Sequence, residues 1–417
     1  MDKIQLAIVG CGGMGGRHLL GLKELQDENV SNVELVAVCD LRRDNAEHRA
    51  DDAERLLGRR PRVFQGMAQM VAELPDLQAV DVTTDAGSHH KVICAAFDLG
   101  LNVLSEKPLG ITVRACNLIL EAQRRSGKLL SVAENYRRDP MLRLTRALLD
   151  AKVIGNPYML FDVSAGSGNQ IIILPWRHNK WLGGILLDAG VHNSDVMQYY
   201  LGSASEVYAR TAQWEPIRYK PGGSSNLSPF YQEWYAEMPD SIEATAEDTL
   251  VSIIQFESGP VGQWTSFCAG HGKGMGAHSI YGSQGSMIPG GARSGTPPRV
   301  YMDGQEEVTG EALLSMVPDF HLDEITTHLF GGERMGSYQM PFPNADRKLL
   351  AIEYYEFAEC VLTGKQPEVD GLMGRKAVSL CYAAFESGTI NRPVTLDEIE
   401  AEQANAYEAP INDHWKI

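Results

Sequence analysis

The feature that most constrains the fold of this chain is a short apolar run followed by closely spaced glycines. Residues Ile4–Val9 lead directly into GCGGMG at positions 10–15, and leucines at helical spacing follow. A short apolar run ended by glycine is typical of a buried parallel strand. The order therefore predicts a strand, a tight turn and a helix packed closely on that strand, as in an α/β domain.

Three glycines of this motif have expected roles. Gly10 permits the tight turn, Gly12 lets a pyrophosphate approach the backbone, and Gly15 lets the helix pack on the strand. The helix N-terminus then offers amide donors and a positive dipole end. The next apolar run, Val33–Cys39, ends in Asp40, which can accept hydrogen bonds from both ribose hydroxyls. We expect a dinucleotide site that takes NAD, because the carboxylate repels the 2′-phosphate of NADP.

Other interpretations of these residues stay open. Arg42 and Arg43 follow Asp40 closely and could instead hold a 2′-phosphate. On its own, Asp40 could simply cap the next helix, and a lone glycine-rich turn is common between a strand and a helix. The ordered combination favours the dinucleotide site over these alternatives.

Strand and helix patterns continue to alternate as far as residue 138. Strands are expected at Val63–Phe64, Ala79–Thr83, Leu101–Ser105 and Leu129–Ala133, with helical patterns between them. We therefore expect residues 1–138 to form a doubly wound, Rossmann-type domain. Ligands bind such domains at the carboxyl ends of the strands. There the sequence places Thr84, His89, Glu106-Lys107-Pro108 and Asn135.

Lys107 is the most informative of these residues. A lysine at a strand end inside a cofactor cleft would be partly desolvated, which lowers its pKa and lets it polarise or deprotonate an alcohol. Pro108 restrains Lys107 to an extended conformation and makes this bond a candidate cis peptide. A solvated loop lysine beside Glu106 is the alternative, and the tripeptide alone favours it.

The pattern after residue 138 changes to longer strands joined by short turns, which predicts an α+β domain with a mostly antiparallel sheet over residues 139–417. Two polar stretches rich in glycine and proline, near residues 215–246 and 289–346, are expected to be insertions that act as lids or oligomer contacts. The polar tail after Glu398 is expected to wrap a neighbour or fray.

One stretch of this second domain, residues 184–195, carries a proton-handling pattern. Asp188, His192 and Asp195 are spaced by four and three residues, so on a helix they would share one face. A histidine between two carboxylates can accept and release a proton, although lone pairs of this kind more often help to cap a helix. The preceding Trp176 and Arg177 suit sugars or phosphates, and a packed loop anchor is their alternative.

Composition excludes several classes of function. The chain has 37 Lys plus Arg against 54 Asp plus Glu, a formal net charge of −17, which argues against nucleic acid and anionic membrane surfaces. No apolar run is long enough to span a bilayer, and no signal region precedes the first strand. The seven cysteines are scattered, without zinc or disulfide spacing. We expect a cytoplasmic protein with no bound metal.

The ordered motifs GCGGMG, Cys39-Asp40, Glu106-Lys107-Pro108 and GGILLDAGVHNSD resemble the Gfo/Idh/MocA oxidoreductase family over nearly the whole chain. The chain is similar to inositol dehydrogenases, glucose–fructose oxidoreductase and sugar 3-dehydrogenases. The family's usual T-P-x-x-x-H is here TDAGSH, residues 84–89, without the proline.

This resemblance implies the make-up of the site. Its catalytic residues would be Lys107, Asp188 and His192, while Asp195 and the segment 135–139 would contact substrate hydroxyls. It also implies an open sheet that pairs subunits into homodimers or homotetramers. The complete predicted cofactor site is Gly10, Gly12, Gly13, Met14, Gly15, Asp40, Arg42, Thr84, His89, Glu106, Lys107 and Asn135. The predicted substrate contacts are Tyr136, Arg137, Trp176, Arg177 and Asp195.

These expectations describe an NAD-dependent dehydrogenase of a sugar, glycoside or cyclitol. Neutral His192 would accept the hydroxyl proton, Lys107 would stabilise the developing alkoxide, and Asp188 would orient substrate hydroxyls or the imidazole. The glycine-rich loop and the insertions favour a glycoside, oxidised at its 3-hydroxyl. One alternative retains the cofactor and cleaves a glycoside by oxidation, elimination and reduction. The other is a non-catalytic, NAD-sensing binding protein.

Overall fold

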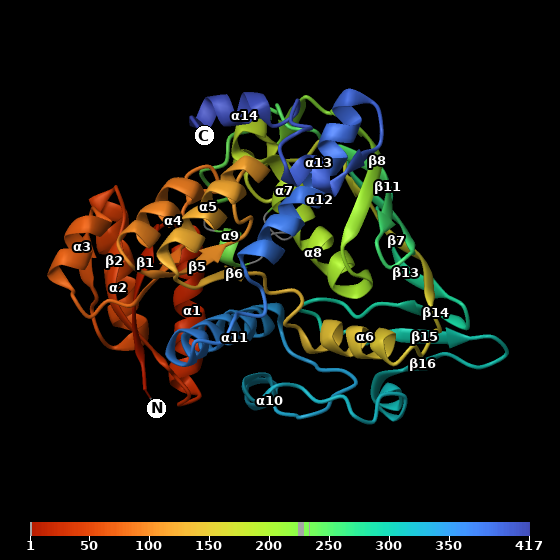
Figure 1. Ribbon diagram of the computed structural model, residues 1–417, viewed down its shortest axis with the longest axis horizontal. Helices are drawn as coiled ribbons and strands as arrows, with labels where there is room; N and C mark the ends of the chain where they lie inside the picture. Colours follow the sequence, from red (N-terminus) through yellow and green to blue (C-terminus); the bar gives the residue numbers. More distant parts are fainter. Residues whose placement is uncertain (1, 224–228, 233) are drawn as a thin grey trace.

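The computed structural model describes residues 2–223, 229–232 and 234–417, and its first large sheet is parallel (Figure 1). The six strands lie in the order β3-β2-β1-β4-β5-β6, which confirms the doubly wound, Rossmann-type prediction. The strands are β1 (Ile4–Val9), β2 (Val33–Cys39), β3 (Arg62–Phe64), β4 (Ala79–Val82), β5 (Asn102–Glu106) and β6 (Leu130–Ala133). The helices between them are α1 (Gly13–Asp27), α2 (Arg43–Leu57), α3 (Met67–Glu73), α4 (His89–Asp98) and α5 (Val113–Ser126).

The turn between β1 and α1 shows why glycines stand there. Gly10 has a φ of 103°, and a Cβ atom on it would lie 2.6 Å from the backbone nitrogen of Thr84. A Cβ atom on Gly15 would lie 2.5 Å from the carbonyl oxygen of Gly10. A side chain at either position would therefore push α1 away from the sheet, as the sequence predicts.

The second large sheet has nine strands in the order β16-β15-β14-β13-β7-β12-β11-β8-β17. All neighbouring strands described in this sheet pair antiparallel except β7 and β12, which confirms a mostly antiparallel sheet. The strands are β7 (Pro157–Ser167), β8 (Ala204–Ala212), β11 (Thr249–Phe256), β12 (Val261–Gly270), β13 (Met275–Gly282), β14 (Gly285–Ile288), β15 (Arg299–Met302), β16 (Val308–Thr309) and β17 (Val394–Thr395).

Helices cover one face of this sheet and leave the other face open. The helices α8 (Gly190–Leu201) and α12 (Gly371–Ile390) pack together on the covered side (Figure 1). The open face carries large apolar side chains that alternate with buried ones along β8 and β11. They are Tyr208, Val251 and Ile253, and each is more than a third exposed.

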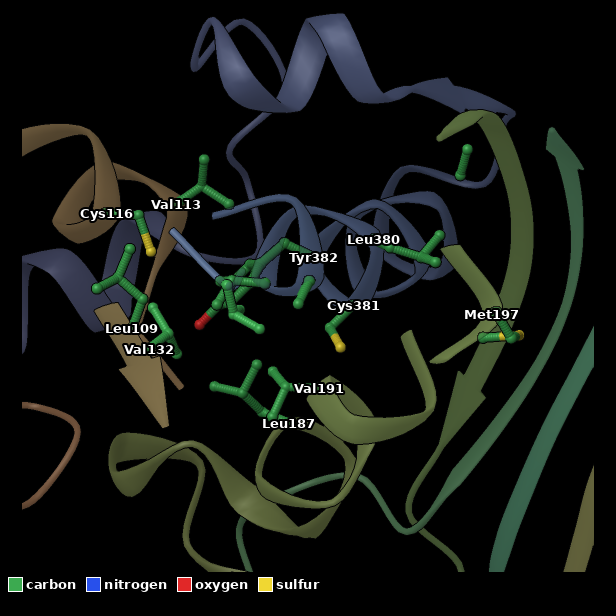
Figure 2. Close-up of a cluster of buried hydrophobic side chains, with 14 of the residues drawn as sticks. Leu109, Val113, Cys116, Val132, Leu187, Val191, Met197, Leu380, Cys381 and Tyr382 are labelled. Atoms are coloured by element: carbon green, nitrogen blue, oxygen red, sulfur yellow. The ribbon is translucent and has the colours of Figure 1, made fainter. Parts of the chain in front are cut away.

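A continuous hydrophobic core joins the two sheets. Figure 2 shows Tyr382 and Cys381 of α12 in one buried cluster with Val132 of β6, Leu187 and Val191. A further helix of the C-terminal part, α11 (Phe342–Thr363), packs on α1 and β1 of the parallel sheet. Packing therefore crosses the predicted boundary at residue 138.

The remaining α-helices and strands are short. They are α6 (Pro140–Asp150), α7 (Gly184–Asp188), β9 (Ile217–Tyr219), α9 (Pro229–Gln232), β10 (Ser241–Glu243), α10 (Glu324–Phe330), α13 (Leu396–Glu400) and α14 (Ala409–Trp415). The first predicted insertion, 215–246, contains residues 224–228 and 233, which lie outside the described part of the chain. No helix among the described residues is long and apolar enough to cross a membrane.

The tail after Glu398 does not fray, because it packs on other parts of its own chain. The hydroxyl of Thr112 donates to Asn412 Oδ1 at 2.7 Å, and the indole of Trp415 donates to the carbonyl of Trp181 at 2.7 Å. Trp415 also packs against Gly87, where a Cβ atom would collide with its ring. The aromatic and amide groups of the tail thus find partners at the N-cap of α5, at Trp181 and on the loop after β4.

Candidate active site

A cavity of about 910 Å³ is lined by both parts of the molecule. From the parallel sheet it is lined by Gly12, Gly13, Met14, Thr84, His89, Glu106, Lys107, Asn135 and Tyr136. From the second part it is lined by Trp176, Arg177, Asp188 and His192. The three predicted catalytic residues therefore lie around one cavity, at the carboxyl edge of the parallel sheet. A second cavity of about 940 Å³, beside β7 and β13, shares Tyr136 and His192 with it.

Lys107 follows β5 directly, and its ammonium group is held by Asp188. Its Nζ donates to Asp188 Oδ1 at 2.8 Å and to the Asp188 carbonyl at 2.9 Å. Burial alone would lower the Lys107 pKa, but the charges of Asp188 and Glu106 outweigh it and raise the pKa above its ordinary value. The expected lowered pKa was therefore wrong, because two carboxylates compensate for lost hydration, and Lys107 is a cation. The bond to Pro108 is cis.

Asp188 lies between two cations. Its Oδ2 accepts a hydrogen bond of 2.7 Å from Arg177 Nε, while Oδ1 accepts from Lys107. Although burial opposes ionisation, these two positive charges hold the Asp188 pKa well below its ordinary value. In the structure Asp188 fixes Lys107 and Arg177, and its side-chain hydrogen bonds go to these two cations rather than to the imidazole, one of the two groups that it was expected to orient.

His192 lies on α8, which is separated from α7 by a break at Ala189, so residues 184–195 form two helices. Its Nδ1 is 2.7 Å from Glu134 Oε2, and the ring of Tyr136 stacks on the imidazole at 4.1 Å between centroids. A ring nitrogen facing a carboxylate carries the proton, so Nε2 is the acceptor of the neutral ring. Burial lowers the His192 pKa, Glu134 partly offsets this, and the Lys107 charge lowers it further.

The sequence analysis missed Glu134, although a signal for it existed. Glu134 directly follows Ala133, the last residue of β6, and its side chain is 4% exposed. It therefore stands at the same sheet edge as Lys107. Carboxylates at strand ends of a doubly wound sheet are candidates for ligand sites, and this rule was applied to Asn135 but not to its neighbour.

Two predicted substrate contacts, Arg137 and Asp195, bind each other away from the cavity. Arg137 Nε donates to Asp195 Oδ2 at 2.8 Å, and a second guanidinium nitrogen donates to the other oxygen. Both side chains are buried, and burial raises the Asp195 pKa to about 6. The guanidinium donors of Arg137 and the carboxylate oxygens of Asp195 bind one another. Neither residue lines the cavity that the other predicted residues line.

On the cofactor side, Asp40 is fixed beside the glycine turn. Its Oδ2 accepts from the backbone nitrogen of Cys11 at 2.7 Å, and its Oδ1 accepts from that of Arg42 at 2.8 Å. The guanidinium of Arg42 pairs instead with Asp44 at an exposed position. His89 is buried, with its two ring nitrogens 2.9 Å from the Pro108 carbonyl and 3.1 Å from the Thr84 carbonyl.

These surroundings fit a dinucleotide. The buried oxygens Thr84 Oγ1 and Asn135 Oδ1 have no hydrogen-bond partner among the described residues, and both residues line the cavity. A Cβ atom on Gly12 would meet no atom within 4 Å, so the turn is open to a close approach. A free hydroxyl, a free amide acceptor and an accessible backbone therefore lie where the motif predicts the cofactor.

Glu106 also lines the cavity, and its carboxylate is held from behind by a buried histidine that the sequence analysis did not consider. His18 Nε2 is 3.0 Å from Glu106 Oε1, and His18 Nδ1 is 2.9 Å from Asp81 Oδ2. Burial lowers the His18 pKa, but these carboxylates outweigh it and raise the pKa to about 10. The cationic imidazole thus fixes the residue that precedes Lys107.

The second predicted insertion, residues 289–346, also reaches the cavity. Arg293 Nη2 donates to the hydroxyl of Tyr136 at 2.7 Å, and Arg293 Nη1 pairs with Asp346 Oδ1 at 3.2 Å. Asp346 in turn accepts from Arg17 Nε of α1 at 2.8 Å. Arg293 therefore holds Tyr136 against His192, although it lies 157 residues away from Tyr136 in the sequence.

Comparison with protein-family models covers both parts of the chain. Residues 4–134 match the model described as "Oxidoreductase family, NAD-binding Rossmann fold". Residues 146–396 match "Oxidoreductase family, C-terminal alpha/beta domain" of the same Gfo/Idh/MocA family. The chain belongs to the Gfo/Idh/MocA oxidoreductase family. The resemblance stated from the motifs is thus confirmed, and NAD is the cofactor of its first domain.

Curated relatives of this family member include dehydrogenases of cyclitols and sugars. The chain is 24% identical to scyllo-inositol 2-dehydrogenase (NAD(+)) of Bacillus subtilis, over 95% of this chain and 97% of that protein. It is 23% identical to myo-inositol 2-dehydrogenase of Thermotoga maritima, over 95% and 99%. The match to levoglucosan dehydrogenase of Pseudarthrobacter phenanthrenivorans, at 28% identity, spans 51% of this chain and 55% of that protein.

Solved structures show the same fold. Levoglucosan dehydrogenase in complex with NADH has a TM-score of 0.71 at 19% identity, covering 95% of this chain and 99% of that one. An oxidoreductase from Agrobacterium radiobacter in complex with NAD+, L-tartaric acid and magnesium has a TM-score of 0.69 at 18% identity, with the same coverage.

Proposed function

We propose that this oxidoreductase oxidises a secondary hydroxyl of a sugar, glycoside or cyclitol. The observation that carries the proposal is that Lys107 and His192, from two different parts of the fold, line one cavity together with the glycine turn. The names of the relatives support this substrate class, since they are dehydrogenases of inositols and levoglucosan.

The two residues have complementary tasks in this proposal. NAD bound at the glycine turn would supply the acceptor for the hydride that leaves the carbinol carbon. His192 Nε2 takes the hydroxyl proton, because Glu134 keeps the other ring nitrogen protonated. Lys107 donates a hydrogen bond to the same oxygen and stabilises the negative charge that develops there. The raised pKa of Lys107 suits this role, since the ammonium group must stay charged during the whole reaction.

The remaining groups position these two. Asp188 holds the Lys107 ammonium at 2.8 Å, and the stacked Tyr136 ring restrains the imidazole plane. Such restraint lowers the entropic cost of bringing the reacting groups together. We assign Asp188, Glu134 and Tyr136 as positioning residues on these contacts.

A panel of monosaccharides, glycosides and inositols, incubated with NAD or NADP, tests the proposal. We expect NADH absorbance to rise with at least one polyol. His192→Ala should abolish this turnover while the affinity for NAD stays nearly unchanged. Turnover near the wild-type rate in this variant would show that the base is misassigned. Product formation without any accumulated NADH would instead indicate the cofactor-retaining route, and NAD binding without turnover would indicate a sensor.

A further inference from the structure

One end of the cavity has an aromatic wall. It is lined by Trp176, which follows the loop after β7, and by Tyr231 and Trp234 from the first insertion. The Tyr231 and Trp234 ring centroids are 6.1 Å apart at an interplanar angle of 50°, and Trp176 is 36% exposed. Flat aromatic faces of this kind pack well on the C–H faces of ring-shaped ligands.

A buried donor group lies against two of these rings. The Arg177 side chain is 9% exposed, and its Nη1 has no hydrogen-bond partner among the described residues. Its guanidinium carbon lies 5.0 Å from the centroid of the Trp176 ring and 5.5 Å from that of Tyr231. A buried donor without an acceptor destabilises the site, so a ligand oxygen placed here gains a hydrogen bond at no competing cost.

This aromatic end adjoins the reacting groups. Asp188 bridges the two cations, with Oδ2 at 2.7 Å from Arg177 Nε and Oδ1 at 2.8 Å from Lys107 Nζ. Only the Asp188 carboxylate therefore lies between Arg177 and a substrate hydroxyl that is held by Lys107. A ligand that is oxidised at Lys107 and extends by one more ring would reach the aromatic end.

We propose that Arg177, Trp176, Tyr231 and Trp234 form a subsite for the second ring of a glycoside whose first ring is oxidised between Lys107 and His192. This inference rests on the proposed function and narrows it to two-ring substrates. A ring hydroxyl accepts from Arg177 Nη1, and the aromatic side chains pack on the ring's apolar face. A neutral hydroxyl suffices, because the guanidinium already pairs with Asp188.

The test compares a methyl glycoside with disaccharides that carry the same oxidisable ring. In the wild type, we expect kcat/KM with NAD to be about tenfold higher for the preferred disaccharide, which corresponds to ~1.4 kcal/mol. Trp234→Ala and Trp176→Ala should each reduce this ratio toward one. Trp214→Ala is the matched control, because Trp214 is 66% exposed and does not line the cavity. It should leave the ratio unchanged.

Equal kcat/KM values for both substrates in the wild type would overturn the subsite while the dehydrogenase function stands. The subsite would also be overturned if Trp234→Ala and Trp176→Ala lowered kcat/KM for the methyl glycoside and for the disaccharide by the same factor. Calorimetric titration of the NADH-loaded enzyme, which cannot oxidise the sugar, gives an independent readout. Tighter binding of the disaccharide, lost in Trp234→Ala, supports the subsite even if no sugar is turned over. Equal binding of both ligands contradicts it.

Discussion

At the residue scale, catalysis in this account depends on how the charge state of His192 is set. Burial and the nearby Lys107 charge lower the His192 pKa below its ordinary value, and Glu134 opposes them. A general base acts only when neutral, so activity is present above this pKa and is lost as the pH falls through it. The acid limb of the kcat/KM profile should therefore lie below pH ~6.5.

Replacing Glu134 with Gln tests this assignment. Glu134→Gln removes the charge that raises the His192 pKa, so the acid limb should move to lower pH. The rate on the plateau should fall about tenfold or more, because the imidazole becomes a weaker and less oriented base. The measurement is kcat/KM against pH, with the exposed Glu257→Gln as control. An acid limb that stays in place would show that the titrating group is not His192.

At the element scale, the order of strands and the glycine turn could be predicted because both depend on local sequence. Gly10 and Gly15 stand where the turn and the close packing of α1 require them. The pairing of His192 with Glu134, 58 residues away, could not be predicted. Hydrophobic periodicity assigns each element separately and does not say which helix faces which strand end. The Lys107 pKa was predicted with the wrong sign for the same reason, since Asp188 comes from another element.

The end of β2 fixes cofactor choice in this account. Asp40→Ala removes the carboxylate that Cys11 and Arg42 hold beside the glycine turn. The KM for NAD should rise about 10- to 100-fold, the value of a hydrogen bond to a charged group, and the KM for NADP should rise far less. Glu54→Ala, at an exposed position farther along α2, is the control. Equal increases for both cofactors would show that Asp40 does not contact the ribose.

The tail is the other element with a measurable contribution. Trp415→Ala removes the packing on Gly87 and the hydrogen bond to Trp181, so the free energy of unfolding should fall by ~1–3 kcal/mol. The KM for NAD should also rise, because Gly87 lines the cavity. Urea denaturation, with Trp214→Ala as control, measures the stability. An unchanged midpoint would mean that the tail does not pack there in solution.

At the scale of the whole molecule, the open face of the second sheet predicts self-association. We expect a homodimer or homotetramer whose mass, by light scattering, is a multiple of 45.8 kDa. Ile253 is 57% exposed beside Tyr208 and Val251, so Ile253→Glu should shift the mass downward by placing charge in the contact. A wild type that elutes as a monomer at all concentrations would contradict this arrangement.

The proposed reaction requires that groups from two parts of the molecule meet at one carbinol. A crystal structure of His192→Ala or wild-type enzyme with NADH and a bound polyol tests this most directly. We predict that the substrate oxygen lies within hydrogen-bond distance of Lys107 Nζ and, in the wild type, of His192 Nε2, with its carbon facing the nicotinamide. A polyol bound elsewhere, or Lys107 and His192 separated by packed side chains, would contradict the account.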